Sequence, residues 1–414
     1  MPPTTLTVQP GTSINLSQMG VQPGQTLVLA PAPYVNIVAH NCPPGVTIAC
    51  DSGMAKVGFV DGMGSVSDLT LRNIDIVPGL EPPDVACSFV AGTGRKMQNI
   101  TLDNVTATGF LKGFAFDNGG GYIKNLALIN LVAARCGSMG YFINDCYGLA
   151  EGCVAYRCGG LDPNRDPTMT RGAYVNGPGM SWRRGLFAFC AMNGIRGGGA
   201  QVDNLALGCA VAFLRGDATK LVRGNVAMLG RDCVRDEPWR ALVGGFEGSA
   251  SFDCAVENNL AGHMRGLGTT YGFMEHGDGS SSPMQRYGAV QYRNNGVIGV
   301  DESNTAGVGY GFDEYCGDMQ CGAVANWFCS QVGGKDTEIK DPSKWIMPPG
   351  AFQKRAFASM VDPTRDPQRY VRDRLGQECW SDDGAIEAIY ESVREDRHKV
   401  GDCIQWLKAG VAVK

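Results

Sequence analysis

The chain has 414 residues, 19% of them charged, and a formal net charge of −5 that is spread without long runs. This balance argues against nucleic-acid binding, which normally leaves a basic face, and no segment approaches the roughly 18 apolar residues of a membrane-spanning helix. The N-terminus, Met1-Pro-Pro-Thr-Thr, lacks the basic and apolar regions of a Sec-type signal. We therefore expect a protein made in the cytoplasm, with no nucleic-acid partner and no membrane span.

The first pattern along the chain is a turn and a strand between Val21 and Ile37, which read Val21-Gln-Pro-Gly-Gln-Thr-Leu-Val-Leu-Ala-Pro-Ala-Pro-Tyr34-Val-Asn-Ile. This segment resembles the opening coil of right-handed parallel β-helix proteins of the pectin-lyase-like class. Gln25 stands where that class usually has Asp, and Ala32 stands where it usually has Gly. The resemblance covers about residues 4 to 330 and implies the fold. At the level of fold class it extends to β-helix virion components of tailed bacteriophages.

From residue 69 onward a short apolar alternation recurs, with an Asn or a Cys between two short strands. The first two examples are Leu69-Thr-Leu-Arg-Asn73-Ile-Asp-Ile and Ile100-Thr-Leu-Asp-Asn104-Val-Thr-Ala. Such a ragged period is typical of a solenoid with insertions. We expect the strands to pair in parallel from coil to coil, and the marked side chains to stack as a ladder at one corner. The predicted ladder comprises Asn73, Asn104, Asn130, Cys153, Cys190, Cys209, Asn225, Cys254, Asn294 and Asn326.

These patterns predict an all-β fold, a right-handed single-stranded parallel β-helix over residues 1–332, with a small C-terminal α-helical appendage. Residues 333–367 are rich in Pro and Asp and are expected to form a connector. In residues 368–414, Ser381 is a capping residue for a helix with Ile386, Ile389 and Val393 on its apolar face. This segment is expected either to cap the open C-terminal end of the β-helix or to dock onto a partner protein.

The chain contains 16 Cys residues. The four in the predicted ladder are expected to be reduced core residues, because stacked Cβ atoms suit packing better than a relaxed disulfide dihedral. Cys136 and Cys158 should lie close together on adjacent coils. A zinc site at Cys316, Cys321 and Cys329 lacks a fourth ligand and the usual Cys-x2-Cys spacing, so no metal site is predicted. Disulfides within or between subunits, with free thiols as the alternative, are expected at Cys42, Cys50, Cys87, Cys136, Cys146, Cys158, Cys233, Cys316, Cys321, Cys329, Cys379 and Cys403.

Catalytic motifs are scarce. Only four His residues exist, and none lies in a recognisable triad or metal motif. The weak catalytic candidate is a Gly-rich loop with Glu275, His276 and Asp278, which is similar only in part to the Gly-His-Gly motif of polygalacturonase-like hydrolases. The paired aspartates of those enzymes have no counterpart on the coils, so the carboxylate separation that glycoside hydrolysis requires has no support.

A weak carbohydrate-binding candidate is the loop with Asp236, Trp239 and Arg240, where an indole ring beside charged groups can stack on a sugar. Loops of this composition are more often solvated turns. No cofactor-binding motif is present, and no cofactor is predicted.

Two functions remain open. The first is a structural component of a tailed-phage virion, such as a collar, capsid-decorating, baseplate or fibre protein. It would be located in the virion, contact other virion proteins, form a trimer or a higher homo-oligomeric ring, and be stabilised by disulfides. The alternative is a carbohydrate-active β-helix enzyme, namely a polysaccharide lyase, hydrolase or epimerase, or a tailspike depolymerase, with a polysaccharide as partner. The sparse catalytic motifs favour the structural, non-enzymatic hypothesis.

Overall fold

The structure is a computed structural model, and it describes residues 5–159, 170–216, 218–230, 242–249, 254–262, 269–276, 290–293, 295–298, 308–312, 322–324, 327–329 and 382–412. The chain consists of two compact units, Met1–Ser181 and Trp182–Lys414, which we call the N-terminal and C-terminal units. In both units the strands belong to two sheets, sheet 1 and sheet 2, and pair in parallel with the next coil. The chain is therefore an all-β parallel solenoid.

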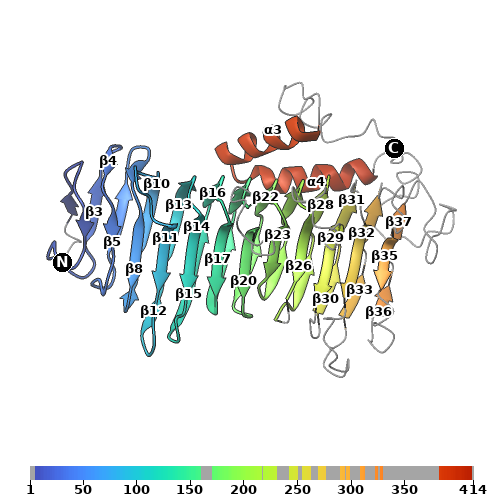
Figure 1. Ribbon diagram of the computed structural model, residues 1–414, viewed down its shortest axis with the longest axis horizontal. Helices are drawn as coiled ribbons and strands as arrows, with labels where there is room; N and C mark the ends of the chain where they lie inside the picture. Colours follow the sequence, from blue (N-terminus) through green and yellow to red (C-terminus); the bar gives the residue numbers. More distant parts are fainter. Residues whose placement is uncertain are drawn as a thin grey trace. The chain divides into compact units, whose positions relative to one another are not determined.

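Sheet 1 of the N-terminal unit contributes one strand to each coil, and its members lie side by side in chain order (Figure 1). They are β2 (Ile14–Asn15), β5 (Ile37–Val38), β8 (Val60–Met63), β11 (Val85–Val90), β14 (Lys112–Asp117), β17 (Met139–Asn144) and β20 (Arg171–Asn176). Sheet 2 completes each coil with shorter or bent strands. They are β1 (Thr5–Thr7), β3 (Thr26–Leu29), β4 (Pro33–Tyr34), β6 (Thr47–Cys50), β7 (Ala55–Val57), β9 (Val66–Ser67), β10 (Thr70–Ile76), β12 (Lys96–Gln98), β13 (Thr101–Thr108), β15 (Tyr122–Ile129), β16 (Val132–Ala134), β18 (Cys146–Glu151) and β19 (Val154–Tyr156).

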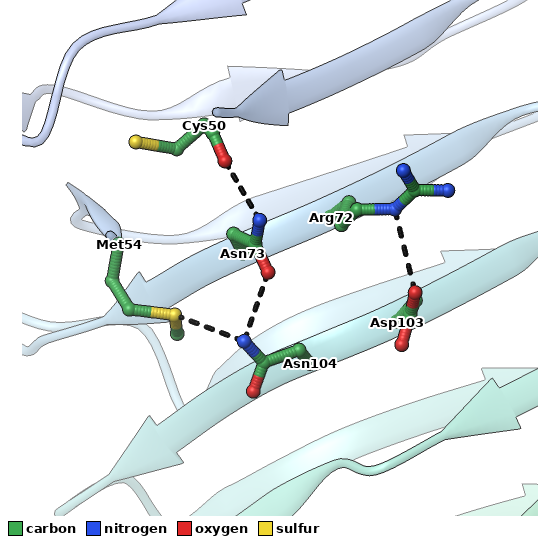
Figure 2. Close-up of polar contacts among 6 residues, drawn as sticks. All are labelled: Cys50, Met54, Arg72, Asn73, Asp103 and Asn104. Carbon is green, nitrogen blue, oxygen red and sulfur yellow. Dashed lines mark hydrogen bonds and ion pairs between the residues drawn. The ribbon is translucent and has the colours of Figure 1, made fainter. Parts of the chain in front are cut away.

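Left-handed Asn residues form one corner of three successive coils in this unit. The φ angles of Asn73, Asn104 and Asn130 are 57°, 52° and 55°, a region that Asn tolerates better than most residues. The amide of Asn104 donates to Oδ1 of Asn73 at 2.9 Å, and that of Asn73 donates to the carbonyl of Cys50 at 2.7 Å (Figure 2). The bend turns Leu71 and Ile74 inward although they are three residues apart. The three predicted Asn positions are thus confirmed as one stacked corner.

The interior of the N-terminal unit is filled by stacked aromatic rings from sheet 1. Phe114 lies 5.2 Å from Tyr141, centroid to centroid, and Phe89 lies 5.6 Å from Phe116, with each pair nearly parallel. All four side chains are fully buried. Because in-register parallel strands place equivalent side chains directly above one another, a ring on one coil packs best against a ring at the equivalent position on the next coil.

The C-terminal unit repeats the same plan, with one sheet 1 strand and short sheet 2 strands in each coil. Its sheet 1 strands are β23 (Asn193–Gly197), β26 (Val211–Arg215), β29 (Leu242–Ser249), β32 (Thr269–His276) and β35 (Val308–Phe312). Its sheet 2 strands are β22 (Leu186–Ala188), β24 (Ala200–Val202), β25 (Leu205–Leu207), β27 (Leu221–Arg223), β28 (Val226–Met228), β30 (Cys254–Glu257), β31 (Leu260–Gly262), β33 (Val290–Arg293), β34 (Gly296–Ile298), β36 (Gly322–Val324) and β37 (Trp327–Cys329), while β21 (Met180–Arg183) contains the boundary between the units.

A continuous Asn ladder lies inside the C-terminal unit. Asn204, Asn225, Asn259 and Asn295 occupy equivalent positions on successive coils and are at most 1% exposed. Oδ1 of Asn225 accepts from the backbone N–H and from the side-chain amide of Asn204, both at 2.9 Å. The same pair of bonds joins Asn225 to Asn259 and Asn259 to Asn295. Every rung thus satisfies both a backbone and a side-chain donor away from water.

Four of the predicted ladder positions need correction. Cys190 and Cys209 lie at a different corner, two residues beyond β22 and β25, and Cys254 is the first residue of strand β30. Cys153 lies one residue beyond the left-handed corner, where Gly152 takes the place equivalent to Asn130. Of the predicted ladder positions in the C-terminal unit, Asn225 does lie in an Asn ladder, but one residue beyond the left-handed Gly224, the position that Cys153 takes after Gly152. Asn294 and Asn326 lie outside the described residues, and the neighbouring Asn295 is the ladder member.

The predicted disulfides are absent among the Cys residues that the structure describes. Cys42, Cys50, Cys87, Cys136, Cys146, Cys158 and Cys403 carry buried thiols and not disulfides. The expectation that Cys136 and Cys158 lie together is confirmed, because their side chains are hydrogen-bonded to each other. The thiols of Cys136, Cys146 and Cys158 donate to backbone carbonyls, as Cys146 does to Asn144 at 3.3 Å, and this satisfies them in the core without a cross-link. Cys233, Cys316, Cys321, Cys329 and Cys379 have no described side chains.

Two helices end the chain, α3 (Asp382–Glu395) and α4 (Lys399–Ala412). Ile386, Ile389 and Val393 of α3 are buried, as their spacing predicts. Within the C-terminal unit, α3 contacts β22 and α4 contacts β25. This helix pair therefore covers a side of the coils, and whether it also caps the C-terminal end of the β-helix or docks onto a partner stays a prediction.

Among the described residues, no helix combines the length and apolar character needed to cross a bilayer.

Candidate functional site

Sheet 1 of the N-terminal unit presents rows of side chains to solvent. In β14, β17 and β20 the inward residues include Phe116, Ile143 and Val175, all at most 3% exposed. Strand alternation places the residues between them on the outer face. Because the strands are in register, equivalent outward residues form rows that run from coil to coil. We call this face the β14–β20 surface; it consists of Lys112, Asp117, Phe142, Asn144, Tyr174 and Asn176.

The middle row of the β14–β20 surface is aromatic. The rings of Phe142 and Tyr174 are 5.9 Å apart between centroids and inclined by only 6°. Lys112 Nζ lies 4.9 Å from the Phe142 ring centre, and the Arg171 guanidinium carbon lies 4.9 Å from the Tyr174 ring centre. Each ring therefore has a cation over it, and both rings remain partly exposed.

An amide and carboxylate row follows the strand ends. The Asn144 amide donates to Oδ1 of Asp117 at 2.9 Å, and the Asn176 amide donates to Oδ1 of Asn144 at 2.9 Å. Asp117 Oδ1 also accepts from the backbone N–H of Gly119 at 3.0 Å. These bonds fix the orientation of the row and leave further lone pairs and amide hydrogens to face solvent.

An ion pair lies on the same sheet, on earlier coils. Nε2 of His40 is 2.7 Å from Oδ2 of Asp61, and both side chains are about one third exposed. Asp61 is in register with Ser88 of β11, and Ser88 is in register with Ala115 of β14. The pair therefore lies on the continuation of the aromatic row towards the N-terminus.

Buried thiols lie close to this sheet and remain protonated. Burial, reinforced by the carboxylate of Asp117, raises the pKa of Cys146 to about 12. Burial and the charge of Asp61 raise the pKa of Cys87 well above its ordinary value. A thiol needs a depressed pKa to act as a nucleophile at neutral pH. These two cysteines are therefore core residues and not catalytic groups.

The chemistry of the β14–β20 surface suits a sugar chain. The partly exposed edges of the stacked rings offer apolar contact to the C–H groups of a pyranose, while an adjacent row of amides and a carboxylate can exchange hydrogen bonds with hydroxyl groups. Among the described residues, no group of three or more His, Cys, Asp or Glu side chains is arranged to hold a metal ion.

Of the site residues predicted from sequence, the structure describes the backbone of two. Glu275 and His276 are the last two residues of β32, in register with Gly248 and Ser249 of β29. Their side chains, together with Asp278, Asp236, Trp239 and Arg240, lie outside the described residues. These candidates therefore stay predictions.

A sequence signal for the β14–β20 surface exists. The three strands read Lys-Gly-Phe-Ala-Phe-Asp, Met-Gly-Tyr-Phe-Ile-Asn and Arg-Gly-Ala-Tyr-Val-Asn, each with Gly second and Asp or Asn last. Aligned by that Gly and that final residue, the fourth positions become Ala115, Phe142 and Tyr174. This repeat in sheet 1 is less conspicuous in the sequence than the Asn and Cys corners of sheet 2.

The chain is similar to several solved structures at low sequence identity. No protein-family model matches the chain, and no curated protein matches it. A mannuronic-acid-specific polysaccharide family 6 lyase from human gut microbiota is 11% identical, with 96% of this chain and 99% of that chain covered and a TM-score of 0.48. An alginate lyase from Paenibacillus sp. is 12% identical over 72% of this chain and 97% of that one, with a TM-score of 0.44. The mannuronan C-5 epimerase AlgE6 A-module of Azotobacter vinelandii is 15% identical over 77% and 93%, with a TM-score of 0.38. At these identities and TM-scores the likenesses carry no argument about activity.

Proposed function

We propose that the N-terminal unit binds a polysaccharide chain along the β14–β20 surface. The observation that carries this proposal is the parallel Phe142–Tyr174 ring pair, at 5.9 Å and 6°, beside the Asn144–Asn176 amide row. Apolar platforms beside oriented polar groups are the combination that small-molecule and sugar sites use for affinity and orientation.

The register of the sheet favours a chain that runs from coil to coil. Neighbouring parallel strands lie about 4.8 Å apart, so ring platforms and amides repeat with that step along the rows. A sugar polymer also repeats its ring face and hydroxyl groups at every residue. Successive sugars can therefore meet equivalent groups on successive coils, which raises affinity through several modest contacts.

The proposal concerns binding, and catalysis is a separate step. A lyase or an epimerase needs a base that can remove a proton from the sugar, and a hydrolase needs two carboxyl groups at a defined separation. On this sheet, Nε2 of His40 is already engaged by Asp61. A carbohydrate-active enzyme is thus a finer version of the proposal, and formation of unsaturated products, new reducing ends or epimerised residues would establish it.

Affinity electrophoresis against polygalacturonate, alginate, dextran and mannan tests binding directly. At least one polymer should retard the wild-type chain. Phe142→Ala and Tyr174→Ala should each weaken that binding about fivefold to tenfold, the equivalent of roughly 1 kcal/mol for a lost stacking platform. Val35→Ala, which removes an exposed apolar side chain elsewhere, is the control and should bind as the wild type does. Migration unaffected by all four polymers, or equal retardation of all variants, would refute the proposal.

A second candidate function is the structural virion component, with other virion proteins as partners and a homo-oligomeric ring as assembly. The fully exposed Leu80, held in a loop with Pro78 and Pro82, favours contact with a partner protein. The cross-linking part of this hypothesis loses support, because the seven described disulfide candidates are buried thiols. Mass photometry of the purified chain tests it: trimers or rings support it, and a monomer at micromolar concentration contradicts it.

A further inference from the structure

A second row of aromatic and basic side chains lies on sheet 2 of the N-terminal unit. In β12, β15 and β18 the residues Met97, Ile123 and Cys146 point inward and are at most 1% exposed. The residues on either side of them therefore point outward. We call this face the β12–β18 surface; it consists of Lys96, Gln98, Tyr122, Lys124 and Tyr147.

Two ammonium groups share one ring on this surface. Nζ of Lys96, from the strand in register with β15, lies 5.6 Å from the Tyr122 ring centre, and Nζ of Lys124 lies 5.1 Å from it. Within the described part of the chain neither lysine forms an ion pair. Two like charges near one ring repel each other, so an anionic group that approaches both relieves that repulsion.

An exposed aromatic platform stands beside the lysines. Tyr147 follows Lys124 by one coil in the same row and is 46% exposed. Its ring lies against the backbone of Gly179, where a Cβ atom would meet the ring carbons at 2.6 Å. Glycine therefore gives the ring room to lie flat on the following coil, and the ring cannot be displaced in that direction without loss of the contact.

The carboxylate of Asp145, the residue before β18, lies against the following coil. Asp145 is in register with Tyr122, and its Oδ1 lies against Gly177 of the following coil. The row is thus basic at Lys96 and Lys124 and aromatic at Tyr122 and Tyr147. A ligand with both a ring face and a negative charge matches both features, whereas a neutral sugar matches one.

We infer that the β12–β18 surface is a second binding site, and that its ligand is an anionic polysaccharide, whose negative groups lie between Lys96 and Lys124 while a neighbouring sugar ring stacks on Tyr147. This inference deepens the proposed function by adding a charge requirement and a second face. It does not depend on the β14–β20 surface, since the two faces belong to different sheets.

Polygalacturonate and its fully methyl-esterified form provide matched probes, because they share a backbone and differ in charge. In titration calorimetry of the full chain, Lys96→Gln/Lys124→Gln should bind polygalacturonate about tenfold more weakly than the wild type at low salt, with a smaller difference at high salt. Binding of the methyl ester should change less than twofold. Lys56→Gln, a charge-matched control on another strand, should leave both unchanged, and Tyr147→Ala should weaken both.

Several results would overturn the inference. They are no binding of polygalacturonate, equal affinity of the double variant and the wild type, or an equal tenfold loss for single-stranded DNA, which would indicate general polyanion attraction. The outcome is separable from that of the proposed function: Phe142→Ala/Tyr174→Ala tests the β14–β20 surface alone, so each face can succeed or fail without the other.

Discussion

Replacement of Asn225 by Ala tests the interior Asn ladder. The Asn225 amide donates to the carbonyl of Gln201 at 2.8 Å and to Oδ1 of Asn259 at 3.1 Å, and its oxygen accepts two bonds from Asn204. Asn225 is fully buried and is not in the left-handed region, so Ala meets no backbone strain there. The variant removes the side-chain partners of the Asn204 N–H and the Gln201 carbonyl, and each buried group left unsatisfied costs about 1–3 kcal/mol.

We therefore expect Asn225→Ala to lower the free energy of unfolding by about 3–5 kcal/mol. The matched control is Asn176→Ala, which removes one exposed bond of 2.9 Å and should cost less than about 1 kcal/mol. Urea unfolding followed by far-ultraviolet circular dichroism measures both. If the two variants lose similar stability, the ladder bonds are not the source of cohesion between coils, and the reasoning from buried satisfaction is wrong.

Three further predictions concern the core and the helix pair. Burial raises the pKa of Cys42 from 9.0 to about 11. Because the thiol of the unfolded chain ionises at lower pH than the buried thiol, the stability of the folded state should fall between pH 9 and pH 11. In a series of melting temperatures measured against pH, Cys42→Ala should show a smaller fall than the wild type. The eleven Cys residues described as buried thiols should react with iodoacetamide at least about a hundredfold faster in urea than in buffer, by peptide mass spectrometry; rapid labelling of the native chain would disprove their burial. Gly208 has φ 64°, and a Cβ atom there would lie 3.1 Å from Ile386 Cδ1. Gly208→Ala should therefore lower the free energy of unfolding by about 1–2 kcal/mol in urea denaturation. Gly401 in α4 has open space around it, so Gly401→Ala should be neutral or raise that free energy by up to about 1 kcal/mol.

The sequence predicts the solenoid because the fold is local and repetitive. An Asn between two short apolar alternations indicates a left-handed corner, and Asn73, Asn104 and Asn130 occupy one. The same reasoning failed at Cys190 and Cys209, since a coil has several corners and a small residue suits each of them. Strand pairing assigns a residue to a corner, and a ragged period hides that pairing in the sequence.

The disulfide expectation failed for a related reason. A count of 16 Cys residues suggested cross-links, but parallel stacking buries thiols such as those of Cys153, Cys158 and Cys209 within the coils, where backbone carbonyls accept their hydrogen bonds. Residue counts cannot tell an inward column from an outward one. That distinction requires the strand register.

The candidate surface was missed because its residues are far apart in sequence. Lys112, Phe142 and Tyr174 belong to three strands separated by two long connections. Only the register of sheet 1 brings a ring beside a ring and an amide beside an amide.

A crystal structure of the chain with a bound oligosaccharide, prepared from whichever polymer retards it in affinity electrophoresis, tests the central proposal most directly. Sugar rings should lie against the exposed edges of Phe142 and Tyr174, with hydroxyl groups hydrogen-bonded to Asn144 and Asn176, and the glycan chain should cross from coil to coil. An oligosaccharide bound on another face, with the β14–β20 surface left to solvent, would contradict it.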